Sequence, residues 1–290
     1  MNKKSKLLIV LNSLKKIVVR SLHLKIDNMA NGQWYNSPFG KKPLASKDIY
    51  STLAAEARSK VYPEVDSYEI DSGYAIDTAW LHELALHTQV VIKKSELCYQ
   101  HGRVLYTTLS KYLNDNPPQN LCDSLNIWET GTARGFSALC MAKSLADQKR
   151  SGTIITFDVL PHTAQMYWNC IDDHDGMKSR AKLLEPWKDL VERYIIFHQG
   201  DTRLEMPKVK AERIHFAFLD GAHTYDDVFF EFNQVRDSQS PGDIIVYDDY
   251  TPKQFPGIVK AVDHICKEYQ YHRTDLKAHD GRGYVVAKKK

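Results

Sequence analysis

The feature that most constrains the fold is a change in the sequence pattern at residue 125. From there to the C-terminus, short runs rich in β-branched residues alternate with longer segments of helical spacing. Strands and helices that alternate in this way build a parallel sheet covered by helices, because each crossover helix packs on a face of the sheet. The sequence therefore predicts an α/β fold, with strands at residues 125–129, 153–158, 195–199, 214–220, 243–248 and 283–287.

Most of the predicted strands end in an acidic residue. Glu129, Asp158, Asp220 and Asp248 each close a run of strand-forming residues. Ligands of open α/β sheets bind in a crevice at the carboxyl ends of the strands. We therefore expect these acids, which are far apart in the sequence, to converge on one crevice.

Residues 46–118 show a different pattern, with three stretches of helical spacing at 47–61, 78–93 and 102–113. A turn rich in Asn and Pro ends the last of them. This pattern predicts a helical cap that precedes an α/β domain at residues 119–290.

Residues 1–45 are predicted to be a basic amphipathic segment followed by a linker. Seven Lys or Arg fall in the first 25 residues, and one face of a helix there would comprise Leu7, Leu11, Leu14, Val18 and Leu22. Such a helix packs on its own domain or on a partner subunit, or else makes a peripheral contact with the inner membrane surface. No stretch approaches the roughly 20 apolar residues that span a bilayer.

With 43% hydrophobic and 26% charged residues, the composition excludes disordered, collagen-like and integral membrane proteins. The formal net charge is only +3 and owes much to the two termini, so we expect no nucleic-acid partner. The five cysteines are scattered and form no C-x-x-C pair. This distribution favours reduced thiols and a cytoplasmic location.

A glycine-containing turn follows the first predicted strand. Gly131 and Gly135 stand between this strand and a helix that begins near residue 135. Glycine lets the backbone approach a ligand closely, and a helix N-terminus offers free N–H groups. Asp158 closes the next strand, where an acid can hold ribose hydroxyls, so the pattern indicates a nucleoside-containing ligand. In the alternative interpretation the glycines only turn the chain and Asp158 is a capping residue.

Three carboxylates, Asp220, Asp248 and Asp249, follow two predicted strands that would be neighbours in this fold. Hard divalent cations such as Mg²⁺ take oxygen ligands and leave positions open for water and substrate. We therefore predict a metal site at these three residues. The alternatives are that Asp249 caps a helix or that Asp248 contacts a cofactor without metal.

His223 lies three residues after Asp220 and so beside the predicted metal site. An attacking hydroxyl must lose its proton, and imidazole has the unperturbed pKa nearest neutrality. His223 is the predicted general base, assisted by Asp220 as a catalytic residue. A histidine that only orders the turn is the alternative.

The order of the motifs resembles that of a known enzyme family. The runs ETGTARGFS at 129–137, FDV at 157–159, QGDT at 199–202, FLDGAHTY at 218–225 and PGDIIVYDDY at 241–250 look like class I S-adenosylmethionine-dependent methyltransferases, and more narrowly like the macrocin O-methyltransferase-like family. The resemblance implies a Rossmann-like seven-stranded sheet. It also implies that Asp158 binds the ribose and that Asp201 and Thr202 bind the adenine edge. The methionine end would be held by Glu129, Gly131, Thr132, Gly135 and Ser137.

The expected activity is transfer of a methyl group from S-adenosylmethionine to a hydroxyl of a sugar-containing acceptor, such as a glycoside, polysaccharide or natural product, assisted by Mg²⁺ or another divalent cation. A catechol or small phenol is an alternative acceptor. A nucleotide-binding α/β protein without methyl transfer is the alternative of another class. We also expect a homo-oligomer.

Overall fold

The structure is a computed structural model that describes residues 37–118, 120, 123–278 and 281–290. The chain divides into two compact units, Met1–Phe39 and Gly40–Lys290, and the fold and the site lie in the second. The predicted basic helix and its membrane contact fall outside the described residues and stay predictions. Among the helices that the structure describes, none combines the length and the hydropathy needed to cross a membrane.

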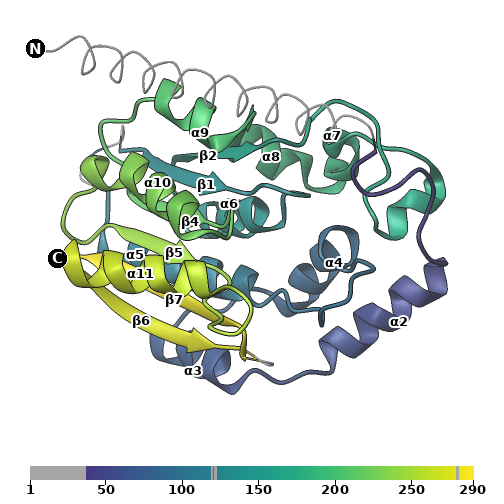
Figure 1. The fold of residues 1–290 in the computed structure, drawn as a ribbon, viewed down its shortest axis with the longest axis horizontal. Coiled ribbons are helices and arrows are strands. Elements are labelled where there is room, and N and C mark those ends of the chain that lie inside the picture. Colours follow the sequence, from purple (N-terminus) through teal and green to yellow (C-terminus); the bar gives the residue numbers. More distant parts are fainter. Residues whose placement is uncertain (1–36, 119, 121–122, 279–280) are drawn as a thin grey trace, which may run out of the picture. The chain divides into compact units, whose positions relative to one another are not determined.

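A seven-stranded sheet forms the centre of the second unit (Figure 1), in the order β3-β2-β1-β4-β5-β7-β6. Strands β1 to β5 are mutually parallel, and β7 runs antiparallel to both β5 and β6. The predicted seven-stranded α/β sheet is thus confirmed. The strands are β1 (Leu125–Thr130), β2 (Gly152–Asp158), β3 (Ile195–Gln199), β4 (Phe216–Leu219), β5 (Ile244–Tyr247), β6 (Tyr271–Lys277) and β7 (Gly283–Lys289).

The sheet is covered on both faces, and its central strands show why. In β4 and β5 every residue is buried, as expected for parallel strands that have helices on both sides. Alternate residues face opposite sides, so Ile127 belongs to one apolar core and Trp128 to the other. Helices α10 (Tyr225–Val235) and α11 (Pro256–Glu268) contribute to the core that contains Trp128.

The other core brings the N-terminal helices and the sheet together. It contains residues of α2 (Lys47–Arg58), α3 (Pro63–Ser72), α4 (Thr78–Thr88), α5 (His101–Asp115) and α6 (Phe136–Asp147). Four shorter α-helical or 3-10 segments, α7 (Arg180–Leu183), α8 (Lys188–Tyr194), α9 (Thr202–Glu205) and η1 (Ile171–Asp175), lie in the connections around β2 and β3. The predicted domain boundaries at residues 45 and 118 stay predictions.

Helix α5 packs closely against α6. Eleven of its fifteen residues are buried, so it is covered on nearly every side. A Cβ at Gly102 would lie 2.6 Å from the Phe136 ring, which shows how near the two helices come. The hydroxyls of Ser110 and Ser144 are 2.8 Å apart across the same contact. Helix α5 is therefore an internal part of the core.

Candidate active site

A cleft of about 190 Å³ opens at the carboxyl ends of the parallel strands. It is lined by residues that follow four strands, and the lining includes Gly131, Asp158, Gly200, Asp201, Thr202 and Gly221. Four of the residues predicted to bind cofactor are thus brought together, from the ends of β1, β2 and β3. The expected convergence of strand ends on one crevice is present.

The turn after β1 needs glycine for a steric reason. Gly131 has a φ of +86°, and a Cβ there would lie only 2.1 Å from the carbonyl oxygen of Asp220. The backbone after β1 therefore lies directly against the backbone after β4. Gly135 has a φ of +91° and stands immediately before α6, at a helix N-terminus that no side chain caps.

Asp158 fixes the shape of this turn. Its Oδ2 accepts a hydrogen bond from the Ala133 N–H at 2.5 Å, and its Oδ1 accepts one from the Leu160 N–H at 2.7 Å. Burial raises the pKa of Asp158, and the nearby Arg180 guanidinium, 3.6 Å away, opposes that rise. Each carboxylate oxygen keeps a further lone pair, so Asp158 can still accept hydrogen bonds from ribose hydroxyls in the cleft.

Three of the predicted donor-binding residues, Glu129, Thr132 and Ser137, have buried side chains. The Glu129 carboxylate is fully buried and accepts hydrogen bonds from the hydroxyls of Ser137 and Thr156. Burial raises the pKa of Glu129 to about 7. Thr132 and Ser137 are 2% and 5% exposed, and their hydroxyls contact Thr156 and Glu129. Their contact with the methionine end of a donor stays a prediction.

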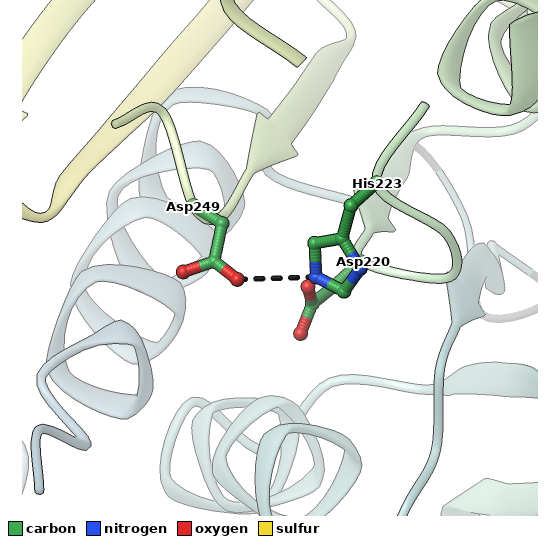
Figure 2. A group of neighbouring side chains, drawn as sticks. All are labelled: Asp220, His223 and Asp249. Atoms are coloured by element: carbon green, nitrogen blue, oxygen red, sulfur yellow. Dashed lines mark hydrogen bonds and ion pairs between the residues drawn. The ribbon is translucent and has the colours of Figure 1, made fainter. Parts of the chain in front are cut away.

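Asp220, His223 and Asp249 form an acidic cluster beside the cleft (Figure 2). One ligand atom from each residue lies within 4.8 Å of the other two. Asp220 follows β4 and Asp249 follows β5, so two neighbouring strands deliver the carboxylates. Two carboxylates and an imidazole are a donor set that fits a divalent cation.

His223 is oriented by Asp249, since its Nε2 lies 3.1 Å from Asp249 Oδ2. This hydrogen bond raises the pKa of His223. Burial by itself would raise the pKa of Asp249, but His223 and Arg282 lower it. The imidazole is 43% exposed, so an acceptor can reach it.

Asp248 lies apart from the three gathered ligand atoms. Its Oδ1 accepts a hydrogen bond from the Asp249 N–H at 2.6 Å, and its Oδ2 is 3.7 Å from Nδ1 of His101. Burial and the neighbouring Asp249 raise the pKa of Asp248 to about 6. The predicted metal ligation by Asp248 stays a prediction, while His223 takes the third place in the cluster.

Two residues at the site, Arg282 and His101, were not predicted. Arg282 Nε and Nη2 lie 3.0 and 2.9 Å from Asp249 Oδ1, and Nη1 donates to the Cys98 carbonyl. Arg282 also lines a small cavity of about 80 Å³ together with Tyr62 and Gln254. Both residues come from distant elements and belong to no local motif, so the sequence held no signal for them.

The cleft and the acidic cluster are separated by a single loop. Gly221 and Ala222 line the cleft, and they stand between Asp220 and His223 of the cluster. A ligand in the cleft and a cation at the cluster would therefore be held side by side.

The comparisons with known proteins agree with this arrangement. Residues 128–250 match a family model described as a methyltransferase domain. The match covers less than half of the chain. The matched range runs from β1 to the residue after Asp249, so it contains both the cleft and the acidic cluster. No curated protein matches the chain by sequence.

Several solved structures resemble this chain in fold. The O-methyltransferase NovP has a TM-score of 0.50 and 16% identity, over 68% of this chain and 83% of NovP. TomG from Streptomyces achromogenes, an O-methyltransferase solved with S-adenosylmethionine, has a TM-score of 0.51 and 15% identity, over 74% and 91% of the two chains. Cofactor-bound Rv0187 from MTB has a TM-score of 0.53 and 14% identity, over 79% and 98%. At these identities the likeness shows the class I methyltransferase fold, and the narrower macrocin branch stays a prediction.

Proposed function

We propose that this chain is an S-adenosylmethionine-dependent O-methyltransferase that uses a divalent cation to methylate a hydroxyl of a sugar-containing acceptor. The observation that carries the proposal is the loop Asp220–His223, which borders the strand-end cleft and also supplies the acidic cluster. The methyltransferase domain match and the cofactor-bound relatives of the same fold support the choice of donor.

The donor would occupy the cleft. Asp158 would bind the ribose hydroxyls, and Asp201 and Thr202 would bind the adenine edge, since all three line the cleft. The Gly131 turn would lie against the methionine end. The loop that carries His223 borders the same cleft, so it would lie beside the bound donor.

The reaction forms one bond and breaks one. The acceptor oxygen attacks the methyl carbon, the carbon–sulfur bond breaks, and S-adenosylhomocysteine leaves. The hydroxyl proton must go to a base, and His223 is placed for this. With Nε2–H donating to Asp249, Nδ1 is the nitrogen free to accept the proton, and the adjacent carboxylate stabilises the resulting imidazolium.

Asp220 and Asp249 would hold the cation, which would leave His223 free to act as the base. A bound cation would lower the pKa of a coordinated hydroxyl, as it lowers that of metal-bound water to about 7. A general base contributes roughly 10² to 10⁴ in rate, so loss of the cation should cost more than loss of His223. Alignment of oxygen, methyl and sulfur adds roughly 7 to 11 kcal/mol.

The test is methyl transfer from S-adenosylmethionine to a panel of sugar and catechol acceptors, with and without a chelator. EDTA should abolish transfer, and added Mg²⁺ should restore it. Asp249→Asn should remove transfer while calorimetry still detects S-adenosylhomocysteine, because Asn tolerates the left-handed backbone at φ +54°. Asp71→Asn, at an exposed carboxylate on α3, is the matched control and should behave as wild type.

Two results would contradict the proposal. Full activity in EDTA would exclude the metal role. Binding of NAD without binding of S-adenosylhomocysteine would exclude the donor. Transfer to catechols with none to sugars would replace the acceptor class and leave the chemistry intact.

A further inference from the structure

A buried carboxylate next to the site has no role in the chemistry so far. Glu231, on α10, is 1% exposed, and its Oε2 accepts a hydrogen bond from the Thr130 hydroxyl at 2.8 Å. Its Oε1 is buried and has no partner at good hydrogen-bond geometry among the described residues, although the Thr202 hydroxyl is near enough to lower the pKa of this carboxylate. A buried carboxylate with one unsatisfied oxygen destabilises the fold, so its presence calls for an explanation.

The Thr130 hydroxyl connects Glu231 to the acidic cluster. The Asp220 N–H lies 3.1 Å from Thr130 Oγ1 and 3.3 Å from the Thr130 carbonyl oxygen. A hydroxyl has one proton, and Glu231 accepts it, so a lone pair of Oγ1 is turned toward the Asp220 N–H. Glu231 thereby sets the direction in which Thr130 holds the Asp220 backbone.

The neighbouring residue of the loop lies directly on this carboxylate. A Cβ at Gly221 would be 2.3 Å from Glu231 Oε1, so a larger residue would displace either the loop or the Glu231 carboxylate. Gly221 is flanked by Asp220, and His223 follows two residues later. The loop that carries two members of the acidic cluster therefore rests on Glu231 at one point and is hydrogen-bonded through Thr130 at the next.

We propose that Glu231 is a positioning residue for the cation site, acting through the Thr130 hydroxyl on the backbone of Asp220. It fixes the loop Asp220–His223 in the arrangement that brings Asp220 and His223 within reach of Asp249. This inference rests on the proposed metal role. Groups that orient metal ligands typically contribute about 10- to 100-fold to metal affinity.

The test measures Mn²⁺ binding to the full chain by calorimetry, with no acceptor present. Thr130→Val removes the hydroxyl at nearly constant volume, and Thr130→Ser keeps it. Glu231→Met removes the acceptor, and Glu231→Gln keeps an oxygen that can accept the same hydrogen bond. Thr130→Val and Glu231→Met should each weaken Mn²⁺ binding by about 10-fold or more, while the two conservative variants stay close to wild type.

Binding of S-adenosylhomocysteine separates positioning from general damage. The affinity for S-adenosylhomocysteine should change by less than about twofold in all four variants, because neither Thr130 nor Glu231 lines the donor cleft. A tenfold change would correspond to about 1.4 kcal/mol. Should Thr130→Val fail to fold, the Glu231 pair decides alone. Equal Mn²⁺ affinity in Glu231→Met and Glu231→Gln, or equal loss of both ligands, overturns the inference. Wild-type protein that binds no Mn²⁺ overturns the metal role in the proposed function, and the inference with it.

Discussion

Gly131→Ala should disrupt the donor cleft and the acidic cluster together. The substitution has two costs. The left-handed backbone at φ +86° disfavours a side chain by about 1–2 kcal/mol. The new Cβ would also meet the Asp220 carbonyl oxygen at 2.1 Å, and a backbone atom cannot rotate away. Overpacking of this kind adds about 1–3 kcal/mol, so we expect a total loss of about 2–5 kcal/mol.

Two other glycines separate these costs. Gly73 has a φ of +77° with nothing within 4 Å of a Cβ, so Gly73→Ala measures the backbone cost alone. Gly135 has a φ of +91°, and its nearest neighbour is a movable side-chain carbon of Leu184 at 2.7 Å. The loss of unfolding free energy should therefore increase from Gly73→Ala to Gly135→Ala to Gly131→Ala.

Urea unfolding measures the stability of each variant, and calorimetry measures its affinity for S-adenosylhomocysteine and Mn²⁺. Gly73→Ala should lower the melting temperature by roughly 2–4 °C per kcal/mol and leave both affinities unchanged. Gly131→Ala should weaken both affinities, because the turn and the loop must separate. If Gly131→Ala matched Gly73→Ala in stability and kept both affinities, the argument from close backbone contact would be refuted.

Three further substitutions test the electrostatics. Burial raises the pKa of Glu129 to about 7, so the free energy of unfolding should fall as pH rises from about 5 to 7. In urea unfolding, Glu129→Gln should show a smaller fall over this range than the wild type. An equally steep fall in both proteins would contradict the prediction. Arg282→Met removes one of the two partners of Asp249 and leaves only His223; it should cost about 2 kcal/mol, less than the loss of a fully buried pair because the guanidinium is 23% exposed. Added Mn²⁺ should then raise the melting temperature of Arg282→Met more than that of wild type. Asp243→Ala removes a fully buried carboxylate at the opposite end of β5. It should cost about 1–3 kcal/mol in urea unfolding, because the buried Tyr112 hydroxyl loses its acceptor while the Arg213 guanidinium left behind is 42% exposed, and turnover per folded molecule should not change.

The strands that are buried on both faces could be predicted from the sequence, because burial leaves continuous apolar runs such as those of β4 and β5. Strand β6 was missed, since it is an edge strand with four exposed polar residues in a row. Helix α3 was missed for a similar reason, because few of its residues are buried. The helix predicted at 78–93 ends at Thr88, and the β-branched residues that follow leave the helix.

The meeting of Asp220 with Asp249 could also be predicted, because both follow strands that are neighbours in this fold. The positions of Arg282, His101 and Glu231 could not, since each reaches the site through tertiary packing of a separate element. Nor does sequence order say which side of a turn a side chain occupies. Glu129 stands in the motif beside Gly131 but points into the core.

The burial of α5 limits how acceptor choice can diverge in a chain of this design. Helix α5 packs against α6, and its Tyr112 hydroxyl donates to the buried Asp243 at 2.8 Å. Most substitutions in α5 would therefore disturb the packing of the core. In a chimera with the N-terminal helices of another protein of this fold, the imported side chains would not pack against α6 and the sheet. New acceptors should instead arise by point changes at the exposed positions of α2 and of the 91–98 segment that precedes α5, such as Ile49, Lys94 and Ser95, since these side chains lie outside the core.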